Sequence, residues 1–326
     1  MYKINFQKPI HIHFIGIGGI SMSGLAEILL EEGFTVSGSD AKESPLTKKL
    51  ESEGAVIHYG QCAENITDDI NCVVYTAAIN KSNPELMEAV GKKIPMLTRA
   101  ELLGQLMKNY DTPIAVSGTH GKTTTTSMIS EVLLAADMDP TISVGGILKT
   151  IGGNIRVGKS GNFITEACEY TNSFLHFYPK ISVILNIEED HLDFFKDLED
   201  IRHSFHQFAA LLPSDGTLII NGDIDNYQEI YEGLDCNVIT YGSSDMLDYS
   251  AANITYDEKG LVEFDLIKNR KAVDHIQLSV TGDHNVSNAL ASIATAELLQ
   301  IPMETIKKGI LSFSGTDRRF EYKGEV

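Results

Sequence analysis

A lysine and a run of threonines follow a short glycine loop in SGTHGKTTTT, residues 117–126. Lys122 supplies a positive charge for terminal phosphates and Thr123 a hydroxyl for Mg²⁺, while successive amides at the start of a helix bind an anion. The common pattern G-x-x-x-x-G-K-[ST] needs a glycine where this chain has Val116, and the nearest earlier glycine is Gly118. A threonine run can simply begin a helix, but capping does not explain Gly-Lys-Thr directly after an apolar strand. The stretch predicts a short phosphate-binding loop.

Acidic side chains follow two later strands of the predicted second sheet. Glu166 and Glu169 stand in TEACEY, and Glu189, Asp190 and His191 stand in NIEEDHLDFF. Open α/β sheets collect their ligands at the carboxyl ends of the strands, and Mg²⁺ takes oxygen ligands there. Any one acidic residue at such a place is more often a helix cap, but two clusters at equivalent positions predict a metal site.

A second glycine-rich turn, GIGGISMSG, runs from Gly16 to Gly24. A strict G-x-G-x-x-G dinucleotide fingerprint would need glycine at Ser21, yet the first glycines still let backbone amides approach a pyrophosphate. Asp40, at the end of the next predicted strand, can meet a sugar hydroxyl. One alternative is a turn needed only for helix–sheet packing. NAD is the default ligand of such a turn, but Gly19 and the SMSG tail are unlike a dehydrogenase turn.

Two weaker patterns lie late in the chain. GDHNVSNAL places His284, Asn285 and Asn288 at the start of a helix, and residues three apart share a helix face. The two amides could therefore meet an adenine edge, although asparagine is also a common helix cap. Arg318 and Arg319 in DRRFE suit a mobile phosphate clamp, or are simply a solvated pair.

The elements that must position these residues alternate between strand and helix. This pattern predicts an α/β fold in which helices cover parallel sheets. We predict a Rossmann-like parallel-sheet domain at residues 1–108 and a phosphate-loop-type α/β ATP-binding domain at 109–314. Short alternating segments within 237–281 predict an added antiparallel edge on the second sheet, and 315–326 reads as an exit linker.

Composition limits the partners. The 326 residues are 43% hydrophobic and 22% charged, which is enough for two packed cores. A net charge of −19 argues against nucleic acid or a membrane surface as the partner. The four cysteines form no C-x-x-C motif, no apolar run approaches the length of a membrane span, and the start lacks a signal peptide. We expect a soluble cytoplasmic protein, and the sequence leaves its oligomeric state open.

Taken in order, these stretches resemble the Mur ligase family over essentially the whole chain. They are HIHFIGIGGISMSGLAEIL, GSD, TAAI, TRAELL, SGTHGKTTTT, EACEY, LNIEEDHLDFF, GDHNVSNALA and GTDRRFE. The family loop has the form G-T-x-G-K-[ST], which Gly118 fits. The resemblance is strongest to the branch that adds L-alanine to UDP-N-acetylmuramate in peptidoglycan precursor synthesis. It implies that ATP converts the muramate carboxylate into an acyl phosphate, which the amine of L-alanine attacks through a tetrahedral intermediate.

The resemblance also implies residue roles and the cofactors ATP and Mg²⁺. Lys122, Glu169 and His191 would be catalytic. Thr123 and Glu169 would bind the metal next to the phosphate, and His191 a second metal near the muramate carboxylate. ATP would be held by Gly118, Thr119, His120, Gly121, Lys122, Thr123, Thr124, Asn285, Asn288 and Arg319. The UDP-sugar would be held by Gly16, Gly18, Gly19, Ser21, Met22, Ser23, Asp40, Thr76 and Ala77.

Two features depart from the family pattern. Several relatives carry a carbamylated lysine about where His206 stands, and the helix DLEDIRHSFHQFAALL has no lysine, which fits the alanine-adding branch. Family members have three domains, whereas this sequence ends at Val326, so the resemblance implies that the amino-acid-binding domain is absent here. We then expect this chain to bind the UDP-sugar and ATP without completing the reaction. The alternatives are a recycling ligase that adds a tripeptide to the same sugar nucleotide, and a nicotinamide-dependent oxidoreductase.

Overall fold

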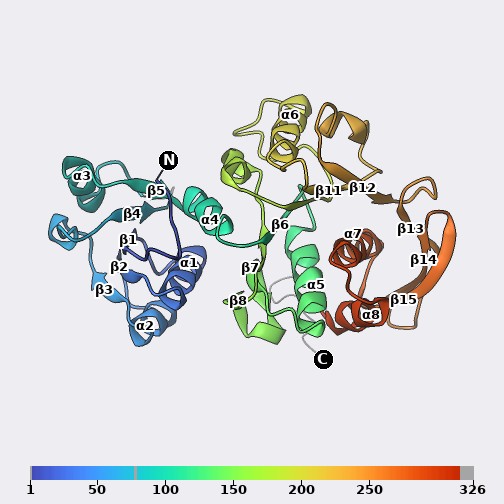
Figure 1. The fold of residues 1–326 in the computed structure, drawn as a ribbon, viewed down its shortest axis with the longest axis horizontal. Coiled ribbons are helices and arrows are strands. Elements are labelled where there is room, and N and C mark those ends of the chain that lie inside the picture. Colours follow the sequence, from blue (N-terminus) through green and yellow to red (C-terminus); the bar gives the residue numbers. More distant parts are fainter. Residues whose placement is uncertain (1, 77–78, 316–326) are drawn as a thin grey trace. The chain divides into compact units, whose positions relative to one another are not determined.

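The chain divides into two compact units, Met1–Asn109 and Tyr110–Val326 (Figure 1). A computed structural model describes residues 2–76 and 79–315. The predicted ligand contacts of Ala77 and Arg319 therefore lie outside the described residues.

Unit 1 is built on a five-stranded parallel sheet in the order β3-β2-β1-β4-β5. Its strands are β1 His11–Ile15, β2 Thr35–Asp40, β3 Val56–Tyr59, β4 Cys72–Tyr75 and β5 Met96–Thr98. Its helices are α1 Ile20–Glu31, α2 Pro45–Ser52, α3 Pro84–Gly91 and α4 Arg99–Met107, with a 3₁₀ turn η1 at Ala63–Asn65. The strand order reverses beside β1, so the glycine turn that follows β1 lies at a topological switch point of the sheet.

Local capping explains where three of these helices begin. Ser44 and Thr47 form a capping box at the start of α2, and Thr98 and Glu101 form another at the start of α4. Asn83 accepts hydrogen bonds from the first amides of α3, which opens with a proline. Each helix thus starts directly after the loop that leaves the carboxyl end of a strand.

Unit 2 is built on a ten-stranded sheet in the order β15-β14-β13-β12-β11-β10-β6-β9-β7-β8. Its first strands are β6 Thr112–Ser117, β7 Thr141–Leu148, β8 Gly153–Arg156, β9 Asn162–Glu166 and β10 Ile181–Ile184. The others are β11 Thr217–Asn221, β12 Asn237–Gly242, β13 Tyr249–Tyr256, β14 Leu261–Lys268 and β15 Lys271–Thr281. Strands from β12 to β7 pair in parallel, while β13, β14 and β15 form an antiparallel meander at one edge and β8 an antiparallel pair at the other.

The helices of unit 2 form two groups. They are α5 Lys122–Ala135, α6 Leu198–Ala209, α7 His284–Leu298 and α8 Met303–Ser312, with 3₁₀ turns η2 Lys149–Ile151, η3 Tyr170–His176 and η4 Tyr227–Ile230. Helix α5 packs against α7 and α8, whereas α6 packs against η3 and η4 (Figure 1). The ring of Phe174 stacks on Phe208 with centroids 4.7 Å apart and meets Phe205 edge-on at 5.4 Å. These three buried rings fasten η3 to α6 and so fix the segment that carries Glu169.

The α/β fold class with its antiparallel edge is confirmed, but the sequence interpretation missed the pair β7 and β8. Glycines interrupt the apolar alternation within β7 and between the two strands, at positions 145, 146, 152 and 153. Glycine weakens the strand pattern because it has no side chain to pack. Tertiary pairing of β7 with β9 outweighs that weak local preference.

Two findings concern the cysteines and the length of the helices. None of the four cysteines forms a disulfide, and burial raises the pKa of the Cys72 thiol to about 12. Among the helices within 2–76 and 79–315, none is long and apolar enough to cross a membrane.

The contact of α8 with α5 predicts a destabilising substitution. A Cβ added at Gly309 of α8 would lie 2.5 Å from the Cα of Val132. Alanine favours a helix over glycine by about 1 kcal/mol, but overpacking a core contact costs about 1–3 kcal/mol. We expect Gly309→Ala to lower the unfolding free energy of unit 2 in a denaturant titration. Gly91→Ala is the control, because a Cβ there meets no atom within 4 Å, and an equal effect of both substitutions would contradict the packing argument.

Candidate functional site

The phosphate loop is a tight turn between the end of β6 and the start of α5. Gly118 and Gly121 have φ values of +147° and +83°, which glycine adopts most readily. Helix α5 begins at Lys122, and no side chain caps its first amides. Those amides and the positive end of the helix dipole are what an anion needs.

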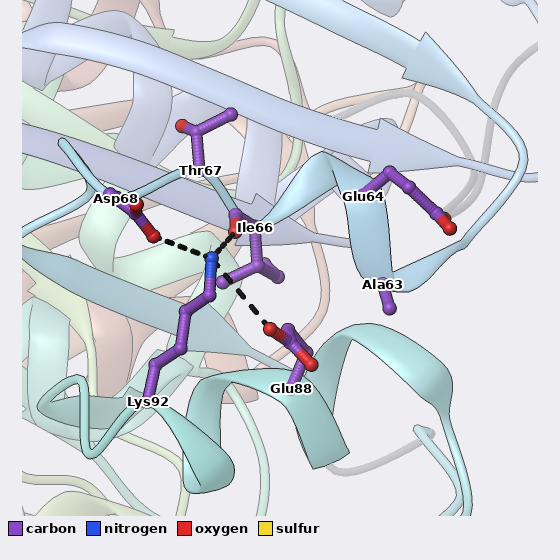
Figure 2. A pocket seen from close by; sticks show the side chains of 7 residues that line it. All are labelled: Ala63, Glu64, Ile66, Thr67, Asp68, Glu88 and Lys92. Atoms are coloured by element: carbon purple, nitrogen blue, oxygen red, sulfur yellow. Dashed lines mark hydrogen bonds and ion pairs between the residues drawn. The ribbon is translucent and has the colours of Figure 1, made fainter.

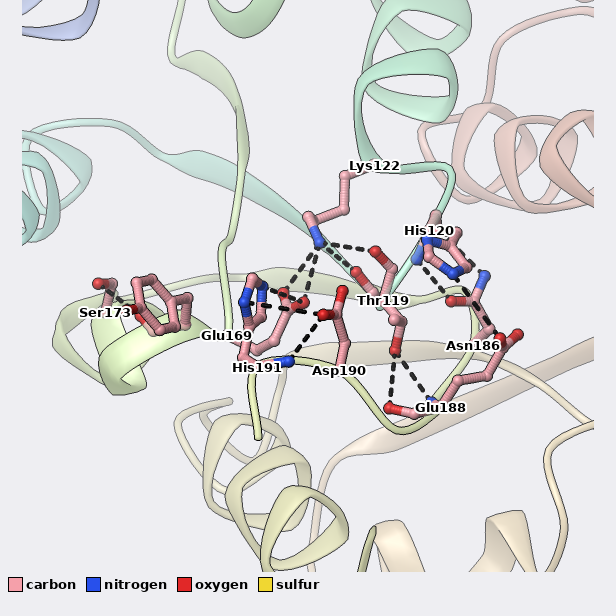
Figure 3. Close-up of polar contacts among 11 residues, drawn as sticks. Thr119, His120, Lys122, Glu169, Ser173, Asn186, Glu188, Asp190 and His191 are labelled. Atoms are coloured by element: carbon pink, nitrogen blue, oxygen red, sulfur yellow. Dashed lines mark hydrogen bonds and ion pairs between the residues drawn. The ribbon is translucent and has the colours of Figure 1, made fainter. Parts of the chain in front are cut away.

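A second loop holds the phosphate loop in place. The side chain of Asn186, just after β10, accepts from the amide of His120 at 2.7 Å and donates to its carbonyl at 3.0 Å. The amide of Glu188 donates to the Thr119 hydroxyl at 2.9 Å (Figure 3). The sequence interpretation missed Asn186, although its place just past a strand end was a signal for it.

Lys122 is the charged centre of the loop. Its Nζ donates to both carboxylate oxygens of Glu169, at 2.9 and 3.1 Å, and also to the carbonyls of Gly118 and Thr119 (Figure 3). The Glu169 side chain is only 3% exposed, so its charge depends on this ion pair. Lys122 and Glu169 come from different strand ends, and the fold brings them together as the sequence predicted.

His191 joins this pair from the loop after β10. Its Nε2 lies 3.8 Å from Oε1 of Glu169, and its backbone has a φ of +52°. The amide of His191 donates to the side chain of Asp190 at 2.7 Å, which stabilises the turn. Tyr170 packs on the imidazole with ring centroids 4.5 Å apart and donates its hydroxyl to Asp193 at 2.8 Å. The sequence interpretation missed this stacking, because nothing in the spacing indicates which rings meet.

Two other predicted acidic residues, Glu166 and Glu189, have different surroundings. Glu166 accepts from the amide of Gly145 at 2.5 Å, and Glu189 is exposed. In the part of the chain that the structure describes, no three His, Cys, Asp or Glu side chains gather as a metal cluster. Mg²⁺ usually keeps several waters and takes one or two carboxylates together with phosphate oxygens. One buried carboxylate, one imidazole and the Thr123 hydroxyl form a donor set that fits this kind of site.

The two residues predicted to contact adenine lie on α7, beside helix α5. Asn285 and Asn288 are buried on α7, and the amide of Asn288 donates to Oδ1 of Asn285 at 3.0 Å. The hydroxyl of Thr125 donates to Oδ1 of Asn288 at 3.1 Å, so this pair joins α7 to α5. Their contact with adenine stays a prediction.

The glycine turn of unit 1 is tied to the end of β2. The amides of Gly16 and Ile17 donate to the carbonyl of Ser39 at 2.8 and 3.0 Å, and the amide of Gly18 donates to the carboxylate of Asp40 at 2.8 Å. Asp40 therefore holds the turn, and its contact with a sugar hydroxyl stays a prediction. Gly19 precedes the first residue of α1, which has no side-chain cap.

The remaining predicted contacts of this turn differ in exposure. Met22 and Ser23 are buried, and the amide of Ser23 already donates to the carbonyl of Gly19 at 2.8 Å, while Ser21 is partly exposed. Thr76 packs beside Gly16, where an added Cβ would be 3.4 Å from its methyl carbon. The sequence interpretation missed Arg99, whose guanidinium donates to the Ser21 hydroxyl at 3.0 Å. Its place directly after β5 was the signal that could have identified it.

A hollow on unit 1 lies near the amino ends of β4 and β5 and not at the carboxyl ends of the strands (Figure 2). It has a volume of about 670 Å³ and is lined by Ala63, Glu64, Ile66, Thr67, Asp68, Glu88 and Lys92. The ammonium group of Lys92 already donates to the carbonyl of Ile66 at 2.6 Å and to Asp68 at 2.8 Å. Lys92 and Asp68 stand shortly before the amino ends of β5 and β4, whereas α/β sheets collect ligands at the carboxyl ends.

The fold and its two glycine turns define an α/β protein built to hold phosphate groups. Two profiles of one family match the chain, "Mur ligase family, catalytic domain" over residues 11–111 and "Mur ligase middle domain" over residues 116–296. The chain belongs to the Mur ligase family.

Named relatives agree with this membership. The UDP-N-acetylmuramate–L-alanine ligase of Agathobacter rectalis is 63% identical over 326 residues, which are 100% of this chain and 71% of that relative. A solved UDP-N-acetylmuramate-alanine ligase from Thermotoga maritima has a TM-score of 0.81 at 29% identity and matches 97% of this chain and 71% of its own. A UDP-N-acetylmuramate:L-alanyl-gamma-D-glutamyl-meso-diaminopimelate ligase from Neisseria meningitides has a TM-score of 0.85 at 29% identity, over 95% of this chain and 100% of that one.

The tight loop predicts that Gly121 cannot be replaced. A Cβ there would lie 2.8 Å from Oδ1 of Asn288, in a backbone conformation that costs other residues about 1–2 kcal/mol. We expect Gly121→Ala to weaken binding of a non-hydrolysable ATP analogue by about tenfold or more in calorimetry. Gly152→Ala is the control, because Gly152 also has a positive φ but meets nothing within 4 Å. Equal nucleotide affinities in the two variants would contradict this view of the loop.

Proposed function

We propose that this chain is an ATP-dependent ligase that joins L-alanine to the carboxylate of UDP-N-acetylmuramate in peptidoglycan precursor synthesis. The single observation that carries the proposal is the position of Lys122, held at the head of α5 between Glu169 and the carbonyls of the phosphate loop. The relative named for this reaction, 63% identical over the whole chain, supports it.

In the proposed reaction, charge accumulates where several anions meet. A carboxylate oxygen of the muramate attacks the γ-phosphorus of ATP, and the bond to ADP breaks. The amine of alanine then attacks the acyl carbon, a proton leaves the nitrogen, and inorganic phosphate departs. Lys122 and the first amides of α5 neutralise the transferred phosphoryl group, which is the main source of catalysis in phosphoryl transfer.

Lys122 is prepared for this role before ATP arrives. Its Nζ bonds to two loop carbonyls and one carboxylate, all oxygen acceptors that a phosphate can replace or join. The γ-phosphate would take the place of the carbonyls, while Glu169 keeps the ammonium group aimed at it. His191, turned toward Glu169, would lie at the muramate carboxylate.

We propose Mg²⁺ as the cofactor, with Thr123, Glu169 and His191 as its protein ligands. When bound, the ion supplies positive charge to the phosphate and carboxylate oxygens during transfer. The buried position of Glu169 beside His191 at the head of α5 supports this assignment, because Mg²⁺ takes one or two carboxylates together with phosphate oxygens.

We propose that the glycine turn of unit 1 holds the UDP part of the substrate. The amides of Gly16, Ile17 and Gly18 already donate hydrogen bonds to Ser39 and Asp40. A pyrophosphate would therefore meet the amides of residues 20–22 at the head of α1, together with the guanidinium of Arg99.

The two alternatives are less favoured. A recycling ligase has the same fold, since the Neisseria structure with a tripeptide-type name superimposes as well as the Thermotoga one, both at 29% identity. The relatives above 50% identity are named for alanine addition, which favours the alanine substrate. A nicotinamide oxidoreductase leaves the phosphate loop and the Lys122–Glu169 pair without a role.

The assignment of ATP to unit 2 and of the sugar nucleotide to unit 1 predicts the effect of Lys122→Ala. Loss of a charged hydrogen-bond donor should weaken Mg²⁺-ATP analogue binding by about tenfold or more. The affinity for UDP-N-acetylmuramate should stay unchanged, because that ligand is assigned to unit 1. Calorimetry with each ligand checks both parts, with exposed Lys259→Ala as the control. Loss of sugar-nucleotide binding in the Lys122 variant would argue against the assignment.

The metal assignment predicts a loss of Mg²⁺ dependence in Glu169→Gln. In the unsubstituted protein, removing Mg²⁺ with EDTA should weaken binding of the ATP analogue. In Glu169→Gln this difference should largely disappear, whereas the neighbouring exposed Glu189→Gln should retain it. If Glu169→Gln keeps the full Mg²⁺ effect, the ion is held by other residues.

A further inference from the structure

A buried carboxylate in unit 1 has no part in the proposed chemistry. Glu85 lies in the first turn of α3 and is 0% exposed. Its Oε2 accepts from the hydroxyl of Ser39 at 2.6 Å, and its Oε1 accepts from the side-chain amide of Asn65 at 2.5 Å. A glutamate is almost never fully buried unless its charge is paired.

Glu85 is held in its charged form. Burial alone would raise its pKa, but the nearby imidazole of His13 and the hydrogen bonds from Ser39 and Asn65 outweigh burial and hold the pKa below the usual value of a glutamate. The Nε2 of His13, also buried, faces Oε2 of Glu85 at 3.8 Å, while Nδ1 of His13 bonds to the Ser37 hydroxyl at 2.9 Å. Three polar neighbours therefore hold the buried carboxylate of Glu85 in one position.

Ser39 connects the side chain of Glu85 to the glycine turn. Ser39 donates its hydroxyl to Glu85, and the carbonyl of the same Ser39 accepts the amides of Gly16 and Ile17. The next residue, Asp40, accepts the amide of Gly18. Three successive amides of the turn thus donate to the end of β2, where the hydroxyl of Ser39 is hydrogen-bonded to Glu85.

The packing around this connection leaves little room for movement. A Cβ at Gly38 would lie 2.7 Å from the Cδ1 of Ile17, and one at Gly18 would lie 2.8 Å from Oδ2 of Asp40. Because both contacts are already close, a small shift at the end of β2 displaces the turn itself.

We propose that Glu85 is a positioning residue for the sugar nucleotide: through Ser39 it fixes the glycine turn, so that the head of α1 meets the pyrophosphate of a UDP-sugar. This inference rests on the proposed function of the glycine turn. Glu85 touches no ligand and acts through the geometry of Ser39 and Asp40.

Two substitutions test the connection in the full chain. Glu85→Gln keeps the size of the side chain and removes its charge, and Ser39→Ala removes the hydroxyl between Glu85 and the turn. Glu88→Gln is the matched control, because Glu88 lies one turn further along α3 and pairs with Lys92. We expect the Kd for UDP-N-acetylmuramate to rise about tenfold in both test variants, the size expected for lost hydrogen bonds to a buried charge. The Kd for the Mg²⁺-ATP analogue should not change, and Glu88→Gln should bind like the unsubstituted protein.

A spectroscopic measurement separates positioning from a purely structural role. In ¹H–¹⁵N spectra without ligand, both variants should shift the amide signals of Gly16, Ile17 and Gly18 while the thermal unfolding midpoint stays above the assay temperature. If Glu85→Gln does not fold, Ser39→Ala decides alone. Unchanged turn amides, or an unchanged sugar-nucleotide Kd in a folded variant, would overturn the inference.

The same data distinguish failure of this inference from failure of the proposed function. If the unsubstituted protein does not bind UDP-N-acetylmuramate, the proposed ligand is wrong, and with it the role of Glu85 in holding that ligand. If the unsubstituted protein binds and the variants bind equally well, only the positioning role is wrong.

Discussion

A net charge of −19 sets the constraint on which this structure depends, because its proposed ligands are themselves anions. The global field repels phosphate, so each phosphate group must be held by donors that act over a few ångströms. Unit 2 meets this requirement with the head of α5 and one lysine. Lys122 is kept in place by Glu169, and the buried glutamate in turn depends on the lysine. The ion pair therefore holds an ammonium group at the head of α5 inside an acidic protein.

The two glycine turns use glycine for different reasons. In the phosphate loop, Gly118 and Gly121 supply positive φ angles and let the chain pass close to Leu185 and Asn288. In unit 1, Gly18 leaves room for the carboxylate of Asp40, which accepts a hydrogen bond from the Gly18 amide and so braces the turn. The bracing leaves the head of α1 as the place where an anion can bind. A third glycine at Ser21 is not needed there, and the serine hydroxyl instead accepts from Arg99.

Much of the architecture follows from the sequence, because its signals are local or depend on strand order. Gly-Lys-Thr after an apolar strand predicts the loop, and the rule that ligands gather at the carboxyl ends of parallel strands predicts that the TEACEY and NIEEDHLDFF segments lie near it. The choice of Glu169 and His191 within these segments came from the resemblance to the Mur ligase family. What the sequence does not contain is the set of contacts that support them. Tyr170 stacks on His191, and the side chain of Asn186 is hydrogen-bonded to the backbone of His120, so both contacts join residues far apart in the chain. Glu85 was equally invisible, since an acidic residue in the first turn of a helix is expected there for electrostatic reasons alone.

The central claim is that two separate sites hold the two nucleotides, the sugar nucleotide on unit 1 and ATP on unit 2. The most direct test is a competition titration of the full chain by calorimetry, first with UDP-N-acetylmuramate and then with the Mg²⁺-ATP analogue on the saturated protein. The account predicts one equivalent of each ligand, with an ATP-analogue affinity that the first ligand does not reduce. Displacement of UDP-N-acetylmuramate by the ATP analogue would place both ligands at one site and contradict the account.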